Sequence, residues 1–317
     1  MNKRRMIGSI VTVNDPILVI AFNRPEPLAK VLERLREVQP RTLYFAVDGA
    51  RANRPGEGDN VQQCRDLIKT VDWECSVSTL FHDENLGCGL GVSTAISWFF
   101  DNVERGIILE DDIVPDPSFF GFCSELLDRY EHDDRVFGVT GCNFVPPENQ
   151  SRPQDAYRFS RVAHIWGWAT WRRSWNSYRL DLEGWHKQLS MRKLWTSSGH
   201  SLSGSLFWAM TFELMARKQV DTWDAQLVYA AMRQEQLMAT CNTNLVNNIG
   251  FGDDATHTLR TVEIEPVGSV TLPTKPVEVL ADDEADAWTR LHHFQVTLPG
   301  LAHQAFNFAT RKLRRAA

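Results

Sequence analysis

Short apolar runs alternate with amphipathic stretches along the first half of the chain. Five runs are predicted as strands: 16–22, 42–47, 75–81, 106–109 and 136–140. Between them, apolar residues recur at helical spacing over four stretches: 28–38, 61–71, 90–103 and 119–130. Strands that are apolar on both faces are typical of a parallel sheet covered by helices. The alternation therefore predicts βαβ units, and with them an α/β fold with a mostly parallel sheet flanked by helices.

The rhythm changes after residue 143. The segment 145–158 is rich in Pro, Asn and Gln and is expected to be a loop, and the Ser- and Gly-rich stretch 196–205 is expected to be a mobile loop. Helices are expected over 207–216, 225–233, 285–293 and 301–315, and a strand over 237–241. One domain is therefore expected, built from a first half, a second half and a C-terminal extension: 1–143, 144–260 and 261–317.

Charge and cysteine content exclude some classes of protein. The net charge of -6 and the pI near 5.9 give no basic field that would attract nucleic acid, so no nucleic-acid partner is expected. The six cysteines form no CxxC pair, which is typical of a reducing compartment. No signal-peptide core and no apolar run of roughly 20 residues is present. We therefore expect a cytoplasmic protein.

Polar side chains follow four of the predicted strands. The residues at these strand ends are Asn23-Arg24, Asp48-Gly49, His82-Asp83 and Glu110-Asp111-Asp112. In open α/β sheets, ligands bind beyond the carboxyl ends of the parallel strands. The sequence therefore predicts that four strands deliver polar groups to one rim of the sheet.

Glu110, Asp111 and Asp112 follow the apolar run 106–109 without a spacer. Adjacent carboxylates repel one another, and a divalent cation relieves that repulsion. Carboxylate oxygens suit Mg²⁺ or Mn²⁺, which also stabilise negative charge on a departing diphosphate. A solvated acidic turn is the alternative, and the direct continuation from an apolar strand weakens it.

An ordered set of short motifs accompanies the acidic triplet. Its members are Ile17–Pro25, Asp48-Gly49, His82, Asn85-Leu86-Gly87, Ile108–Asp112, Gly167-Trp168, Trp223-Asp224 and Gly252–His257. In this order, over residues 16 to about 257, they resemble the GT-A family of nucleotide-sugar glycosyltransferases. Within that family the chain is most similar to N-acetylglucosaminyltransferase I and its bacterial relatives. The acidic triplet alone is weak evidence, whereas the ordered set is much stronger.

The resemblance implies that 1–143 binds the donor and that 144–260 binds the acceptor and carries catalysis. On the donor side it places Arg24 against the nucleotide, Asp48 against the base, His82 nearby, Asp112 on the metal, and Glu110 and Asp111 near the ribose and metal-bound water. Asn23, Asn85 and Gly87 belong to the same donor site. Gly87, Gly89 and Gly91 open a helix, which indicates either close backbone approach to the nucleotide sugar or a plain helix-capping turn.

The resemblance places the catalytic base in the second half. Asp224, at the start of a predicted helix, is the candidate, with Asp221 as the fallback; a simple N-cap is the alternative role for Asp224. His257 lies either near the metal or diphosphate or at an ordinary surface position. Eleven tryptophans are present, and we expect one or two of Trp166, Trp168 and Trp223 to stack on a sugar, while others pack in the core.

The function implied is an inverting, metal-dependent glycosyltransferase using Mn²⁺ or Mg²⁺. Its expected donor is a UDP-sugar such as UDP-GlcNAc, and its expected acceptor is a glycan or a lipid-linked glycan. The alternatives are a nucleotidyltransferase that makes nucleotide-sugars, which the glycine-free segment 23–27 argues against, and a non-catalytic glycan-binding module. The basic amphipathic stretch 301–315 either docks on the protein or makes a peripheral contact with the inner face of the membrane.

Overall fold

The computed structural model describes residues 13–250 and 265–297. Its centre is an eight-stranded sheet. From one edge to the other its strands are β3 (Ser76–Phe81), β2 (Thr42–Val47), β1 (Ile17–Ala21), β4 (Arg105–Glu110), β8 (Trp168–Trp171), β6 (Val136–Thr140), β9 (Leu237–Cys241) and β7 (Tyr157–Ser160). All run in one direction except β8 and β7, which are antiparallel to their neighbours. The predicted α/β fold with a mostly parallel sheet is confirmed.

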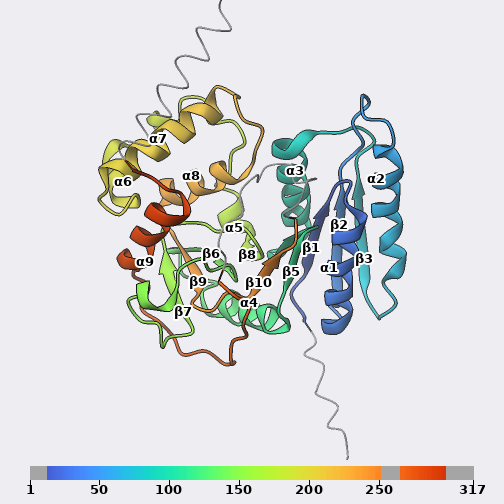
Figure 1. Cartoon of the computed structure of the whole chain (residues 1–317), viewed down its shortest axis with the longest axis horizontal. Helices are drawn as coiled ribbons and strands as arrows, with labels where there is room; N and C mark the ends of the chain where they lie inside the picture. Colours follow the sequence, from blue (N-terminus) through green and yellow to red (C-terminus); the bar gives the residue numbers. More distant parts are fainter. Residues whose placement is uncertain (1–12, 251–264, 298–317) are drawn as a thin grey trace, which may run out of the picture.

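The helices connect the strands and cover the sheet (Figure 1). They are α1 (Pro25–Val38), α2 (Glu57–Asp66), α3 (Gly87–Asn102), α4 (Pro117–Arg129), α5 (Arg172–Trp175), α6 (Met191–Ser197), α7 (Leu202–Ala216), α8 (Asp224–Gln234) and α9 (Asp283–Trp288). A π-helical turn, Thr289–His293, follows α9. Two short strands, β5 (Ile113–Pro115) and β10 (Val246–Asn248), form a separate antiparallel pair.

Alternating side chains of the buried strands fill two core layers. In β1, Ile17, Val19 and Ala21 pack in one layer with apolar residues of α1, α2 and α4. Leu18 and Ile20 pack in the other layer with residues of α3, α7 and α8. This alternation follows from the period of two along a strand, and it explains why β1 is apolar on both faces.

The second half departs from the expectations at the last two residues of one loop and in the Ser- and Gly-rich stretch, and it contains a strand, β8, that was not predicted. The expected loop 145–158 ends in β7, and the Trp-rich segment contributes β8, which lies between β4 and β6 in the main sheet. The Ser- and Gly-rich stretch 196–205 is not one mobile loop, because α6 extends to Ser197 and α7 begins at Leu202. Ser201 caps α7 by accepting a hydrogen bond from the Gly204 amide at 3.1 Å. This serine therefore marks the start of a helix and does not belong to a loop.

The main sheet continues across residue 143. β6 lies before this point in the sequence, whereas its neighbours β8 and β9 lie after it. Among the described helices, none combines the length and apolar character needed to cross a bilayer. The expected helix over 301–315 and the candidate His257 lie outside the described residues.

Candidate functional site

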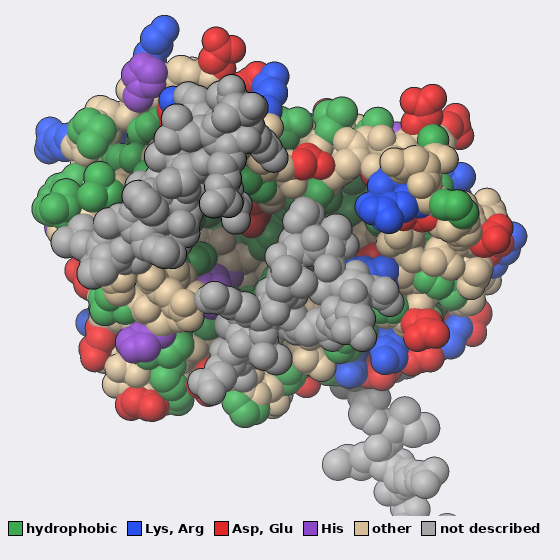
Figure 2. Space-filling view, turned by 45° about the horizontal axis from the view of Figure 1, so that its top comes forward, with side chains coloured by type: hydrophobic (Ala, Val, Ile, Leu, Met, Phe, Trp, Pro, Cys, Tyr) green, Lys and Arg blue, Asp and Glu red, His purple; other side chains and the backbone are tan. Residues whose placement is uncertain are grey.

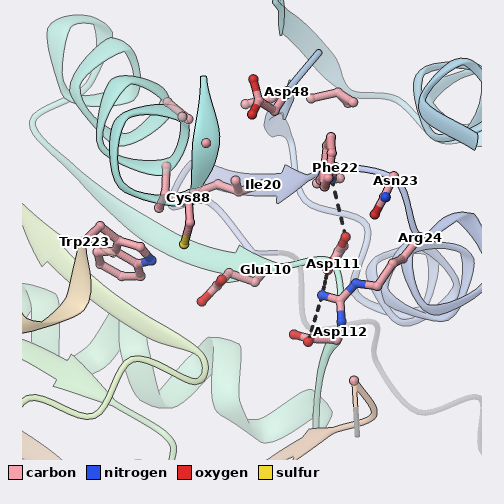
Figure 3. Close-up of a pocket in the computed structure, with 18 of the residues that line it drawn as sticks. Ile20, Phe22, Asn23, Arg24, Asp48, Cys88, Glu110, Asp111, Asp112 and Trp223 are labelled. Carbon is pink, nitrogen blue, oxygen red and sulfur yellow. Dashed lines mark hydrogen bonds and ion pairs between the residues drawn. The ribbon is translucent and has the colours of Figure 1, made fainter. Parts of the chain in front are cut away.

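A cavity of about 500 Å³ lies beyond the carboxyl ends of β1, β2 and β4 (Figure 3). Residues from both halves of the chain line it. Those from the first half include Phe22, Asn23, Arg24, Asp48, Arg51, His82, Asn85, Gly87, Cys88, Glu110, Asp111 and Asp112, and those from the second half include Trp166, Asp221, Trp223, Asp224, Asn248 and Gly250. The parallel strands therefore bring their polar ends to one rim, as their direction requires.

The three acidic residues after Leu109 point in two directions. Asp111 and Asp112 both accept hydrogen bonds from Nη2 of Arg24, and the Arg24–Asp112 contact measures 2.9 Å. The amide of Phe22 also donates to Asp111, at 3.4 Å. Glu110 instead points into the cavity on the side of Cys88 and Trp223 (Figure 3). β4 ends at Glu110, and the turn that follows it directs Asp111 and Asp112 towards Arg24.

Negative charge at this strand end is only partly compensated. Burial, and then the charges of Asp112 and Asp111, raise the pKa of Glu110 to about 8. Burial also raises the pKa of Asp111 to about 6, although the Arg24 charge opposes that shift. The Arg24 guanidinium contacts two of these carboxylates, and its positive charge opposes the rise in the pKa of the third, Glu110. Such a set of hard oxygen donors with excess negative charge suits a divalent cation.

The carboxylates at this strand end fit Mn²⁺ or Mg²⁺ in a site where substrate phosphates and water would complete the set of ligands. Within residues 13–250 and 265–297, no three His, Cys, Asp or Glu side chains converge as a complete metal site. Mg²⁺ is usually held by one or two carboxylates together with substrate phosphates and water. Asp112, whose side chain is 14% exposed at the cavity, is the carboxylate that would hold the cation. Glu110 and Asp111 would add negative charge beside it.

Gly250 brings the backbone of a distant segment against Asp112. A Cβ atom built on Gly250 would lie 2.0 Å from Oδ2 of Asp112 and 2.8 Å from Nη1 of Arg24. Any side chain at this position would displace the carboxylate, so close approach requires glycine. Gly250 is missing from the residues predicted for the site. Its signal in the sequence was its place in a polar, Gly-bearing segment after β9.

Asp48 and Asn85 tie the end of β2 to the loop before α3. The Asp48 carboxylate accepts hydrogen bonds from the Gly49 amide at 2.9 Å, the Leu86 amide at 3.0 Å and the Asn85 side chain at 2.9 Å. Asn85 also donates to the Gly49 carbonyl at 2.9 Å. These hydrogen bonds hold the cavity wall together around Asp48. Recognition of a nucleotide base by the Asp48 oxygens stays a prediction.

His82 carries an unsatisfied ring nitrogen at the cavity. Its Nε2 is buried and has no hydrogen-bond partner among the described residues. Buried polar atoms are nearly always paired, so an orphaned one calls for an explanation. The His82 side chain lines the cavity, and its contact with a nucleotide stays a prediction.

Asp221 reaches across from the second half to the start of α3. Its carboxylate accepts hydrogen bonds from the amides of Cys88, at 3.0 Å, and Gly89, at 2.9 Å. Cβ atoms built on Gly87 and Gly89 would lie 2.6 Å and 2.7 Å from its oxygens. The glycines at this helix start therefore admit an intramolecular carboxylate, and this anion satisfies the positive end of the helix.

Replacing Asp221 with Ala is expected to lower the free energy of unfolding by about 1 kcal/mol, because two amides at the start of α3 lose their acceptor. Urea denaturation would measure this loss. Asp59→Ala on the exposed face of α2 is the matched control, with an expected change within about 0.5 kcal/mol. Equal effects of the two substitutions would contradict the capping role.

Asp224 is the first residue of α8. Its Oδ1 accepts hydrogen bonds from the Thr222 hydroxyl at 2.5 Å and the Ala225 amide at 2.7 Å. Burial, and then the negative charges of Glu110, Asp221 and Asp224, raise the pKa of the Cys88 thiol to about 12. Carboxylates from both halves of the chain therefore converge around Cys88.

Of the three candidate tryptophans, Trp168 and Trp223 belong to the same core layer, and Trp166 packs against the other layer. Trp166 and Trp223 line the cavity, whereas Trp168 is not among its lining residues. Trp168 is 1% exposed and stacks on Trp223, with ring centroids 5.9 Å apart. Trp168 lies in the buried central strand β8 and packs behind Trp223, so the expected one or two sugar contacts are left to Trp166 and Trp223.

The lining residues absent from the predicted site include Arg51, Cys88 and Asn248 as well as Gly250. Arg51 forms an ion pair with Glu57, and its guanidinium lies 5.4 Å from the ring centroid of Phe22. Its position three residues after Asp48 was a usable signal, since strand ends line this rim. Asn248 comes from β10, which pairs with β5. No local pattern in the sequence predicted this pairing.

On the visible face, Lys and Arg side chains among the described residues are interspersed with Asp and Glu side chains (Figure 2). A mixed surface of this kind accords with the net charge of -6. Mixed charge does not produce the basic stripe that tracks a phosphate backbone. The expectation that nucleic acid is not a partner rests on the net charge and the pI of the whole sequence.

Comparisons with known proteins give structural matches alone. No protein-family model matches the chain, and no curated protein matches it in sequence. Mouse xyloside xylosyltransferase 1 matches with a TM-score of 0.37 and 13% identity, over 71% of this chain and 84% of that one. A UDP-glucose pyrophosphorylase complexed with UDP-glucose matches at 0.36 and 8%, over 72% and 90%. The inositol-1-phosphate CTP transferase of T. maritima matches at 0.36 and 11%, over 72% and 85%. Scores this low assign neither family nor activity.

Proposed function

We propose that the chain is an inverting, metal-dependent glycosyltransferase that uses a nucleotide diphosphate sugar. One observation carries this proposal. The carboxylates after β4 and Asp224 at the start of α8 line the same cavity, although 112 positions separate Asp112 from Asp224 in the sequence. A site with a cation-binding edge and a separate carboxylate provides the two functions that inverting sugar transfer needs.

Asp224 would act as the general base in this reaction. One oxygen of its carboxylate is oriented by Thr222 and the Ala225 amide, which leaves the other to accept a proton. The acceptor hydroxyl would lose its proton to Asp224 while its oxygen bonds to the anomeric carbon. The bond from that carbon to the diphosphate oxygen breaks, and the electron pair leaves with the nucleotide. A divalent cation would supply charge stabilisation to this leaving group.

The donor is best sought among UDP-sugars, with UDP-GlcNAc first, and the acceptor among glycans and lipid-linked glycans. Residues 1–143 would bind the donor, with Asn23, Asp48, His82 and Asn85 around the nucleotide. Residues 144–260 would bind the acceptor, with Trp166 as the main candidate for a sugar face, because Trp223 lines the cavity but is only 2% exposed. Support for this division is that side chains from both halves of the chain line one cavity.

A thermal-shift panel of UDP-, GDP- and dTDP-sugars, with and without Mn²⁺, tests the proposal. We expect a shift with UDP-sugars that depends on Mn²⁺, since a ligand at 100 times its Kd stabilises a protein by about 2.7 kcal/mol. Asp112→Asn should remove the Mn²⁺-dependent part. A shift with GDP-sugars alone would refute the uridine assignment.

The products separate the competing activities. A glycosyltransferase releases nucleoside diphosphate from the nucleotide sugar. A nucleotidyltransferase releases pyrophosphate from a nucleoside triphosphate and a sugar phosphate. A glycan-binding module binds sugars without releasing either product. Pyrophosphate release, or sugar binding with no turnover of any nucleotide sugar, would therefore refute the proposed function.

A further inference from the structure

We propose that Arg24 and the divalent cation compete for Asp112, and that the nucleotide diphosphate resolves the competition in favour of the cation. Arg24 then acts as a built-in counter-cation that couples metal binding to nucleotide binding. The inference rests on the proposed function, because it assigns a regulatory role to a residue of that same site.

The contacts of Arg24 carry the first step. One guanidinium nitrogen, Nη2, contacts both Asp111 and Asp112. On Asp112 it contacts Oδ2, the same oxygen against which the backbone of Gly250 packs. That oxygen is therefore enclosed between a guanidinium and a main-chain segment. A cation can use both Asp112 oxygens only when Arg24 moves away.

Electrostatics provides the second step. A guanidinium and a divalent cation on one carboxylate repel each other, and the repulsion is strong where solvent screening is poor. The Asp111 and Asp112 side chains are 5% and 14% exposed, so screening there is weak. Each cation accordingly lowers the affinity of the carboxylate for the other.

The third step concerns where Arg24 goes. Its side chain is 23% exposed and lines the cavity, so a bound diphosphate is within reach of a long, flexible residue. Guanidinium groups pair with phosphate oxygens by two parallel hydrogen bonds. A diphosphate would thus give Arg24 a new anionic partner and release Asp112 to the cation. Coupling of this kind is reciprocal: the nucleotide tightens metal binding by the same factor by which the metal tightens nucleotide binding.

The test is the affinity of the full chain for Mn²⁺, measured from the electron paramagnetic resonance signal of free Mn²⁺, with and without UDP. In wild-type protein UDP should tighten Mn²⁺ binding. Arg24→Met should bind Mn²⁺ about tenfold tighter than wild type without UDP, and the effect of UDP should shrink. Mn²⁺ should also raise the Tm of Arg24→Met more than that of wild type, because the carboxylates there lack their counter-ion.

Arg51→Met is the matched control. Arg51 is another arginine of the cavity wall, but it pairs with Glu57 rather than with the acidic triplet. Its loss should change Mn²⁺ affinity less than the loss of Arg24 does. Equal gains from both substitutions would show a general charge effect and would overturn the direct competition.

The outcomes separate this inference from the proposed function. If Asp112→Asn abolishes Mn²⁺ binding while Arg24→Met binds Mn²⁺ no better than wild type, the competition is refuted and the function stands. If wild-type protein binds neither Mn²⁺ nor any nucleotide, both fall. Should Arg24→Met fail to fold, Arg24→Lys decides. A single ammonium holds two carboxylates less well, so tighter Mn²⁺ binding than wild type supports the inference, and unchanged binding overturns it.

Discussion

Replacing Asp224 with Asn is expected to lower the rate of sugar transfer by about 10²- to 10⁴-fold and to leave nucleotide-sugar binding nearly unchanged. An amide cannot take the proton of the acceptor hydroxyl. The amide oxygen can still accept the hydrogen bonds that Oδ1 of Asp224 receives from Thr222 and the Ala225 amide. The start of α8 should therefore keep its geometry, and the loss should appear in kcat.

Steady-state kinetics with a UDP-sugar, together with thermal shifts for donor binding, would measure this effect. Asp221→Asn is the informative companion, because Asp221 is the fallback base and its oxygens accept from the Cys88 and Gly89 amides. An Asn there keeps only one of the two acceptors at the start of α3, because the Cys88 and Gly89 amides donate to different oxygens of Asp221. A large loss of kcat in Asp221→Asn, with Asp224→Asn close to wild type, would transfer the base role to Asp221.

Replacing Trp168 with Ala is expected to lower the free energy of unfolding by about 3–5 kcal/mol. Trp168 is 1% exposed in the central strand β8 and stacks on Trp223. Its removal would leave a cavity directly behind a residue of the site. Urea denaturation with a global fit of the m-value would measure the loss, and Trp195→Ala is the control. Trp195 is 40% exposed, so its removal should cost far less.

Trp168→Phe distinguishes packing from sugar recognition. An aromatic ring in the same core position keeps much of the buried area and of the contact with Trp223. We expect this variant to transfer sugar at nearly the wild-type rate once it is folded. A normal stability combined with a large rise in acceptor KM would show instead that Trp168 contacts the sugar.

The first half of the fold was predictable because its signals are local. The runs that form β1, β2 and β4 are apolar on both faces, and the stripes that form α1 and α4 have helical spacing. Strand direction then places the end of each parallel strand at one rim. The gathering of Arg24, Asp48, His82 and Glu110 around one cavity follows from these two facts.

The second half was less predictable because its strands depend on distant partners. β8 is four residues long, and its neighbours are β4 and β6, both from earlier in the chain. A segment of Trp, Ala and Thr becomes a central strand only when the sheet supplies a place for it. The prediction of a loop over 196–205 was wrong for a different reason. Serine is common both in loops and at helix N-caps, and Ser201 is the N-cap of α7.

The local sequence pattern was sufficient to establish the α/β class, the strand ends and the kinds of polar side chain that lie there. The reason is that the periodicity of side chains and the direction of the strands are properties of the chain itself. Pairings between remote residues belong to the folded molecule. Asp221 on the start of α3, Arg24 between Asp111 and Asp112, and Gly250 against Asp112 join segments 87 to 138 positions apart. Only the packed sheet brings such partners within bonding distance, and these contacts decide how the carboxylates are shared.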